Sequence, residues 1–187
     1  MTIMKTKAAI VEAALATVML TAPQWTEGAP KGSRKDYKAA MKQAEKAYAN
    51  RDFRTAELMI REAIAEGERF KERDGYLSES LSALAKLLSA QDQFEEALPP
   101  LRRSVEIMER IYSARDERLL SSNILLADLL RFTDRFEEAE KTYISARDVL
   151  RKTRGAYASS VGACAFGLGI IYAEQGKLDE AETALSE

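Results

Sequence analysis

The sequence predicts an all-α, right-handed α-solenoid built from tandem helix-turn-helix repeats. The first observation behind this prediction is self-similarity: segments 50–56, 91–97, 133–139 and 175–181 resemble one another, and each ends in an alanine. These alanines, Ala56, Ala97, Ala139 and Ala181, stand 41, 42 and 42 residues apart. The second observation is a composition of 46% hydrophobic and 31% charged residues with only 9 Gly and 4 Pro, which is typical of folded helical proteins. A fixed period of this length indicates an array whose neighbouring units bury one another's apolar faces.

Each repeat is expected to contain two helices joined by a tight turn. Twelve residues before each alanine stands another small residue within an apolar helical pattern: Ala44, Ala85, Ala127 and Gly169. Small residues at both places allow the two helices of a unit to approach closely. A larger apolar residue is expected to fill the corner at each turn: Phe53, Phe94, Phe136 and Leu178. Another follows each alanine after four residues: Ile60, Leu101, Tyr143 and Leu185.

Turn chemistry fits the same division into helices. Asp92 and Asp134 each precede a glutamate by three residues, Glu95 and Glu137. This is the spacing of a capping box with aspartate as the N-cap, so both aspartates are predicted to start second helices. Gly176 occupies the equivalent turn of the last unit, where a positive φ costs a glycine little.

This pattern of small, small and aromatic positions resembles the tetratricopeptide repeat (TPR), and the 42-residue period resembles the longer repeats of kinesin light chains. Pro99, two residues after Ala97, stands where that variety often has a proline in its second helix. The chain departs from the family where the loop often carries Leu-Gly and His-Pro, because only Gly155 is present. It also has Ala83 and Leu125 where kinesin-type repeats often carry a groove-lining asparagine. The resemblance therefore implies the fold and a general role in binding proteins, but not the cargo-peptide clasp.

On this basis residues 34–187 form a TPR domain with repeats at about 36–76, 77–118, 119–160 and 161–187. The last repeat is incomplete, and no polar capping helix follows it, although solenoid ends normally need one. Two explanations stay open. Either the natural protein continues beyond Glu187, or another chain covers Leu178, Ala181 and Leu185, which would allow self-association through the uncapped repeat.

Residues 1–33 are interpreted as a signal peptide and linker. Lys5 and Lys7 precede a 13-residue apolar run over 8–20 that contains Glu12 and Thr17, which is too short to form a stable membrane span. Cleavage after Ala22 or Gly28 would make the protein secreted or periplasmic. The alternative is a degenerate half-repeat, and the protein would then be cytoplasmic.

Composition excludes several kinds of chemistry. The chain has no histidine, and Cys164 is its only cysteine. A Ser-His-Asp triad, a Cys-His dyad, a Cys/His zinc site and an internal disulfide are therefore all excluded. Cys164, among small and apolar neighbours, is expected to be a packed hydrophobe. Glycines 162, 167 and 169 are expected to serve close helix packing instead of a phosphate loop. We expect no enzyme activity, no cofactor and no metal site.

The predicted function is that of a scaffold or adaptor for other polypeptides. The 28 basic and 30 acidic residues are mixed along the chain, so a nucleic-acid partner is not expected. The first helices of the repeats should line a concave groove for a peptide or helix of a protein partner. Its predicted lining, which also includes Met41 and Ala83, is Lys42, Glu45, Glu79, Ser82, Lys86, Ser121, Ile124, Leu125, Asp128, Arg131, Phe132 and Phe166. Burial of Ile124, Leu125 and Phe166 between helices is an open alternative. The competing function is a self-assembly module or a regulatory fragment of a larger TPR protein.

Overall fold

The structure is a computed structural model that describes residues 33–70, 75–153 and 158–186. Within these residues it contains helices and no strand, which confirms the predicted all-α class. The helices are α2 (Arg34–Ala49), α3 (Phe53–Gly67), α4 (Tyr76–Ser89), α5 (Phe94–Ile111), α6 (Glu117–Phe132), α7 (Phe136–Lys152), α8 (Ala158–Glu174) and α9 (Leu178–Ser186). None of these described helices has the length and hydropathy needed to cross a membrane. The predicted signal peptide and Gly155 lie outside the described residues.

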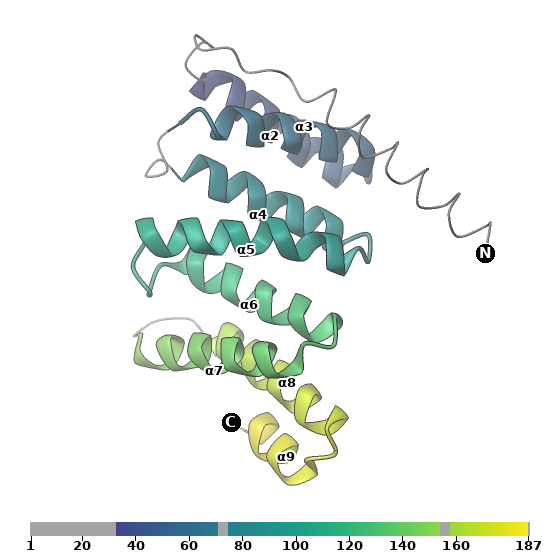
Figure 1. Cartoon of the computed structure of the whole chain (residues 1–187), viewed down its shortest axis with the longest axis vertical. Helices are drawn as coiled ribbons and strands as arrows, with labels where there is room; N and C mark the ends of the chain where they lie inside the picture. The colour runs from purple at the N-terminus through teal and green to yellow at the C-terminus, as the bar shows by residue number, and fades with distance from the viewer. Residues whose placement is uncertain (1–32, 71–74, 154–157, 187) are drawn as a thin grey trace, which may run out of the picture. The chain divides into compact units, whose positions relative to one another are not determined.

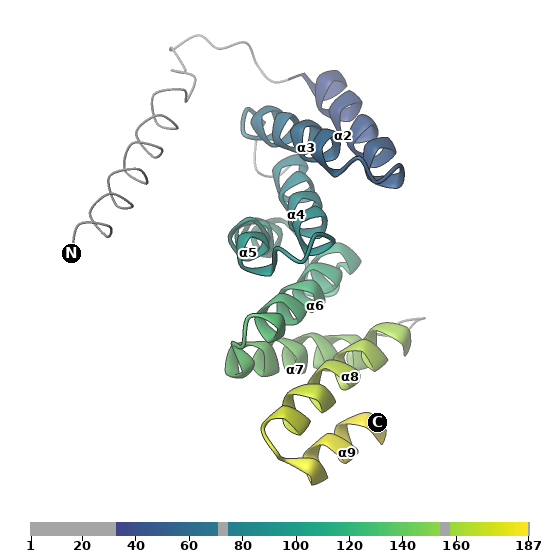
Figure 2. The ribbon, with the colours of Figure 1, turned by 90° about the vertical axis from the view of Figure 1, so that its right-hand side faces the viewer.

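The helices follow one another as four antiparallel pairs, α2 with α3, α4 with α5, α6 with α7 and α8 with α9 (Figures 1 and 2). Each pair packs on the next through α3 and α4, α5 and α6, or α7 and α8. Among the first helices, α2 also contacts α4 and α6 contacts α8. Because the first helices adjoin in this way, they share one side of the stack, which we call the inner face. This is the arrangement of an α-solenoid.

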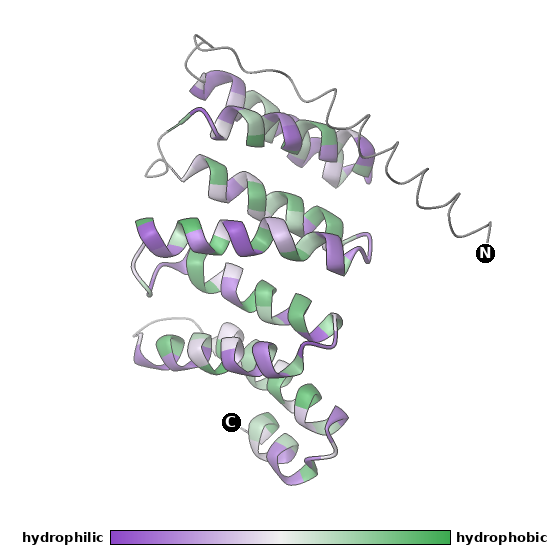
Figure 3. Cartoon of the chain, in the orientation of Figure 1, coloured by the Kyte–Doolittle hydropathy of each residue, from purple (hydrophilic) through white to green (hydrophobic). Residues whose placement is uncertain are grey.

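The small residues lie where the sequence predicts close approach. Ala56, Ala97 and Ala139 in the second helices are 0% exposed, and Ala85 and Ala127 in the first helices are also 0% exposed. They belong to one apolar cluster that runs from the first pair to the last. Figure 3 shows the hydrophobic and hydrophilic residues alternating along most helices, as amphipathic packing requires. Packing within each pair and packing between neighbouring pairs therefore form one continuous core.

The fourth pair follows this pattern only in part. Gly169 and Ala181 are buried, but Leu178 at the corner and Leu185, two turns further along α9, are 69% and 57% exposed. The expectation that Leu178 fills the corner is wrong. Leucine is shorter than the phenylalanine of the other turns, and within the described residues no helix packs on the far side of α9.

The predicted capping boxes are wrong. Asp92 and Asp134 have φ of 59° and 57°, and the N-caps of α5 and α7 are the following residues, Gln93 and Arg135, which make no side-chain capping bond. The aspartates lie in the turns that follow α4 and α6, beyond the C-caps Ala90 and Thr133, in the left-handed conformation, where Asp is tolerated and Gly preferred. Gly176 has φ of 74° at the equivalent place, as predicted.

The other local predictions depend on side-chain packing. Cys164 is 0% exposed, and burial raises the pKa of its thiol to about 11, so it is a packed, protonated side chain. Gly167 and Gly169 lie against Tyr143 and Leu185, whereas a Cβ on Gly162 would meet no atom within 4 Å. Close packing therefore accounts for two of the three glycines. Pro99 lies inside α5, as expected, and Pro100 follows it there.

Candidate functional site

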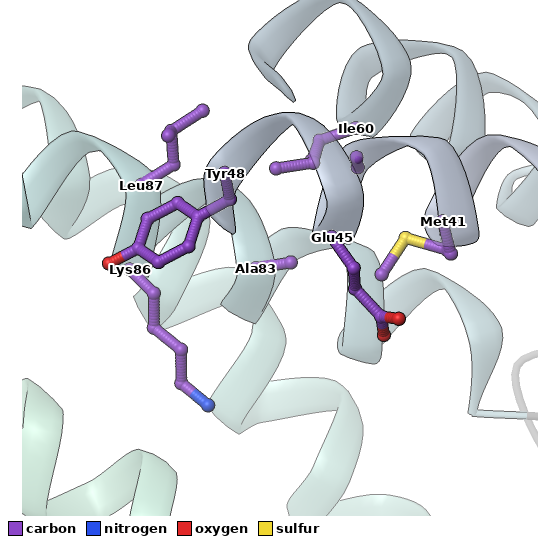
Figure 4. Close-up of a pocket in the computed structure, with 8 residues that line it drawn as sticks. Met41, Glu45, Tyr48, Ile60, Ala83, Lys86 and Leu87 are labelled. Atoms are coloured by element: carbon purple, nitrogen blue, oxygen red, sulfur yellow. The ribbon is translucent and has the colours of Figure 1, made fainter. Parts of the chain in front are cut away.

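The inner face carries two adjoining cavities between the first three repeats. The first has a volume of about 290 Å³ and is lined by Met41, Ala44, Glu45, Tyr48, Ile60, Ala83, Lys86 and Leu87 (Figure 4). The second has a volume of about 380 Å³ and is lined by Met41, Glu79, Ser82, Ala83, Lys86, Met108, Glu117, Arg118, Ser121 and Ser122. Both include Met41, Ala83 and Lys86. We call this continuous depression across α2, α4 and α6 the inner groove.

The first cavity is an apolar hollow with a charged rim. Its floor consists of the buried side chains Ala44, Ile60 and Leu87. Met41 and Tyr48 stand two turns apart on α2 and mark its two ends (Figure 4). Glu45 and Lys86 are the charged residues of its lining, and both are exposed. An apolar group of a ligand that enters this cavity would be removed from water. The adjacent groups of the same ligand would remain close to Glu45 and Lys86, which carry opposite charges.

The second cavity is more polar and includes a network around Arg118. The Arg118 guanidinium donates to both carboxylate oxygens of Asp116, from Nε at 3.1 Å and from Nη2 at 3.0 Å. It also lies 3.8 Å from the centre of the Tyr112 ring and 3.7 Å from the Glu79 carboxylate. These bonds lower the pKa of Asp116 below its usual value. Burial instead raises the pKa of Glu79, and the distant Arg118 opposes that shift only in part.

The floor of the second cavity includes a set of buried hydroxyls. The Ser82 side chain lies 2.8 Å from the Ser104 hydroxyl and 3.3 Å from that of Ser122. Ser104 in turn donates to the Ser78 carbonyl at 2.6 Å. Because these serines are small and mutually satisfied, α4, α5 and α6 can approach closely without an orphaned polar atom. Ser82, a predicted groove residue, is only 6% exposed. Its hydroxyl is bonded to Ser104 and Ser122, so little of the side chain is accessible to a ligand.

The predicted groove residues of α6 are largely engaged inside the protein. Asp128 accepts a hydrogen bond of 2.5 Å from the Tyr143 hydroxyl and lies 3.8 Å from Arg131. Burial raises the pKa of Asp128, and both burial and the Asp128 bond raise the pKa of Tyr143. Ile124 and Leu125 are half-buried and pack against the main core.

Two predicted aromatic residues are exposed but do not line the inner groove. Phe132, at the end of α6, is 50% exposed and stacks on Phe94 with 4.5 Å between ring centres. The Arg131 guanidinium lies 4.1 Å from the centre of the Phe132 ring. Phe166 is 61% exposed on α8, a helix with no charged residue before Glu174.

The structure thus brings together part of the predicted site. Glu45, Glu79, Ser82, Lys86 and Ser121 line one or both cavities, whereas Lys42 is exposed on α2 outside them. Sequence reasoning missed several lining residues: Tyr48, Ile60, Leu87, Met108, Glu117 and Arg118. Tyr48 follows Ala44 by one helical turn and could have been found from that spacing. Ile60 and Met108 come from second helices, so a reading confined to first helices could not include them.

No group of His, Cys, Asp and Glu among the described residues is arranged to hold a metal ion. The carboxylates of the inner groove share its lining with Lys86, Arg118 and serine side chains, which can form hydrogen bonds and ion pairs. The arrangement is therefore suited to recognition of apolar and charged side chains.

Comparison with known proteins is consistent with this fold. Sequence profiles of the tetratricopeptide repeat match residues 77–116 and 118–187, which together make up more than half of the chain. No curated protein matches the chain in sequence. Two solved structures of similar fold contain nearly identical TPR-like repeats of a Podosopora anserina protein described as a kinesin light chain. They are 18% and 20% identical, with TM-scores of 0.72 and 0.71, and the alignments cover 97% and 94% of this chain and 83% and 82% of theirs.

More distant structures share the same fold. BtubC (BKLC) from P. vanneervenii is 20% identical with a TM-score of 0.64, over 80% of this chain and 69% of its own. The apo form of RapI is 14% identical with a TM-score of 0.71, over 80% of this chain and 40% of its own. At these identities the likeness concerns the fold.

Proposed function

The chain belongs to the tetratricopeptide repeat family, whose helix pairs serve as scaffolds for protein–protein interaction, and from this premise we propose that its inner groove binds a peptide segment of another protein. The observation that carries the proposal is the continuity of the two cavities. They share Met41, Ala83 and Lys86 and extend across three consecutive first helices. A chain segment can occupy both at once, with apolar side chains in one and polar side chains in the other.

The chemistry of the inner groove favours recognition over catalysis. The raised pKa of Glu79 has burial as its cause. Of the three serines that line the same cavity, Ser82 and Ser122 are buried and bonded to one another, and Ser121 is exposed. The one thiol of the chain, Cys164, is buried and protonated in α8. We therefore propose a scaffold without catalytic activity, secreted or periplasmic if the first 28 residues are a signal peptide.

The proposal can be tested with a library of random dodecapeptides displayed on phage and selected on the full chain. Enriched peptides are synthesised with a fluorescent label, and their dissociation constants are measured by anisotropy. The groove variant is Lys86→Glu, because Lys86 is the charged residue common to both cavities. The matched control is Lys141→Glu, the same substitution at an exposed position of α7, a second helix.

We expect Lys86→Glu to change the dissociation constant by about fivefold or more, because a rim charge is reversed at the contact. Lys141→Glu should stay within twofold of wild type. Failure to enrich any peptide, or equal effects of the two substitutions, would show that the inner groove is not the binding surface.

A further inference from the structure

The first cavity exists because one contact position changes size between repeats. The repeat register pairs, at each junction, a residue of the earlier second helix with the residue two positions before the small residue of the next first helix. The residue of the second helix is the one four positions after the buried alanine of that helix, Ala56, Ala97 or Ala139. The three pairs in order are Ile60 with Ala83, Leu101 with Leu125, and Tyr143 with Gly167.

The second and third pairs fill their junctions in different ways. Leu101 is 0% exposed, and Leu125 packs against the same core. At the third junction the Tyr143 ring occupies the space above Gly167, so closely that an added Cβ would lie 2.3 Å from it. Only the first pair combines a medium-sized side chain with alanine, and both Ile60 and Ala83 line the open cavity. Alanine at position 83, where the next repeat has Leu125, therefore leaves the space that forms this cavity.

We propose that this cavity receives one large aliphatic or aromatic side chain of a partner segment, and that the same segment carries a lysine or arginine that sits beside Glu79. The inference rests on the proposed function and specifies the chemistry of the segment bound in the inner groove. The partner is therefore recognised by an apolar anchor with a cation next to it.

Size and polarity support the anchor. A volume of about 290 Å³ lies at the small end of the range for ligand sites, roughly 300 Å³ and upward, so it suits a single side chain better than a whole ligand. The floor is apolar and buried, and Met41 and Tyr48 stand at its two ends (Figure 4). Polar groups of the entering segment would have no partner at this floor, whereas an apolar side chain loses nothing by leaving water.

Charge supports the cation. Asp116 and Glu79 share the single guanidinium of Arg118, and Asp116 holds it by the two shorter contacts. Among the described residues, the half-buried Glu79 carboxylate has one cationic contact, at 3.7 Å, and Glu117 adds an exposed carboxylate to the same cavity. A cationic side chain from the partner would give Glu79 a closer counter-charge than any that the described residues supply.

Register fixes the spacing between anchor and cation. Glu79 precedes Ala83 by one turn of α4, about 6 Å along the helix axis. Residues i and i+2 of an extended segment are separated by about 7 Å and point to the same side. In a helical segment the same distance corresponds to residues i and i+3 or i+4. We therefore expect the anchor and the cation at one of these spacings.

The test repeats the peptide selection on the full chain and compares three variants. Ala83→Leu places in the cavity the residue that the third repeat carries at the equivalent position, so the fold has a precedent for it. Ala163→Leu is the matched control, since Ala163 is exposed on the inner face of α8 and lines neither cavity. Glu79→Gln removes the charge without changing the size. Circular dichroism checks that each variant is as helical as wild type.

Selected peptides should share a large apolar residue with Lys or Arg at one of the predicted spacings. Ala83→Leu should weaken them roughly tenfold to hundredfold, the equivalent of excluding one buried side chain. Glu79→Gln should weaken them about threefold to tenfold and reduce the dependence on salt. Ala163→Leu should leave affinity within twofold. Replacing the anchor or the cation of the peptide by alanine should reproduce the same losses, whether or not the Ala83→Leu protein folds.

Peptides that bind Ala83→Leu as tightly as wild type but are weakened by Lys86→Glu would overturn the anchor inference and leave the inner groove as a binding surface. Peptides without a cation would overturn the charge inference. No enrichment at all would overturn both this inference and the proposed function. A concentration-dependent dimer in sedimentation that Ala83→Leu abolishes would identify a second copy of the chain as the occupant and would also overturn the inference.

Discussion

Gly167→Ala is predicted to destabilise the protein, although alanine is normally the better residue inside a helix. Gly167 lies within α8 and is buried against the ring of Tyr143. A Cβ at this position would lie 2.3 Å, 2.6 Å and 2.7 Å from Cζ, the hydroxyl oxygen and Cε2 of Tyr143. The ring cannot retreat freely, because Tyr143 is 0% exposed and its hydroxyl bonds Asp128 at 2.5 Å.

Two opposing effects decide the magnitude. Replacing glycine by alanine in a helix interior stabilises by about 0.5–1 kcal/mol. Overpacking a closed site usually costs about 1–3 kcal/mol. We therefore expect a net loss of roughly 0.5–2 kcal/mol, together with displacement of the Tyr143 hydroxyl from Asp128.

The assay is urea unfolding followed by circular dichroism, in a cycle with Tyr143→Leu. Leucine is the residue of the second and fourth repeats at this position, and it lacks the ring that Gly167 accommodates. In that background Gly167→Ala should stabilise by about 0.5–1 kcal/mol, because only the helical preference remains. The reversal of sign is the critical result. If Gly167→Ala stabilises the wild-type chain, the close contact with Tyr143 does not control this junction.

Three further outcomes are expected. Burial raises the folded-state pKa of Asp128, so the stability that the protonated side chain contributes is present below about pH 4 and is lost as pH rises through the folded-state pKa. The urea midpoint of wild type, measured relative to that of Asp128→Asn, should therefore fall as pH rises from about 4 through that pKa. Asp92→Gly should stabilise the protein by about 0.5–1 kcal/mol, because glycine suits the positive φ at this position. If Asp92 were an N-cap, the same substitution would lower the stability, and the direction of the change in thermal unfolding temperature decides between these two roles. Cys164, with its pKa raised to about 11, should react with a thiol reagent at least about a hundredfold more slowly in the native protein than in denaturant; equal rates would show an accessible thiol.

The fold was predictable because the small residues that recur in the sequence are the ones that must be buried where two helices approach closely. A small residue at Ala56, Ala97 or Ala139 is needed wherever two helices approach closely, and each of these residues is fully buried. The turns were less predictable, since aspartate suits two different positions near a helix end. Asp92 has the spacing of an N-cap but lies in the left-handed conformation in the turn between α4 and α5, and only the backbone angle separates the two roles.

The candidate site was predictable for side chains that lie on the exposed stripe of a first helix, such as Glu45, Glu79 and Lys86. The register of α6 marks Asp128 and Arg131 as equally available. In the structure the hydroxyl of Tyr143, from the next helix, reaches Asp128 across the gap that Gly167 leaves. Register within one helix cannot reveal a partner that arrives from another helix.

The same reasoning explains why a cavity arises between nearly identical repeats. In an alignment of the repeats, Ala83 stands in the column of Leu125, and Ile60 stands in the column of Leu101. Each column alone shows only the replacement of one apolar residue by another. The cavity depends on the combined size of two residues that belong to neighbouring repeats, because Ile60 is its floor and Ala83 its wall. Where both members are leucine, or where one large ring covers a glycine, the junction is filled; where an isoleucine is paired with alanine, it stays open. In an array of this kind the pairs across junctions, more than the repeats themselves, determine where a partner can insert a side chain.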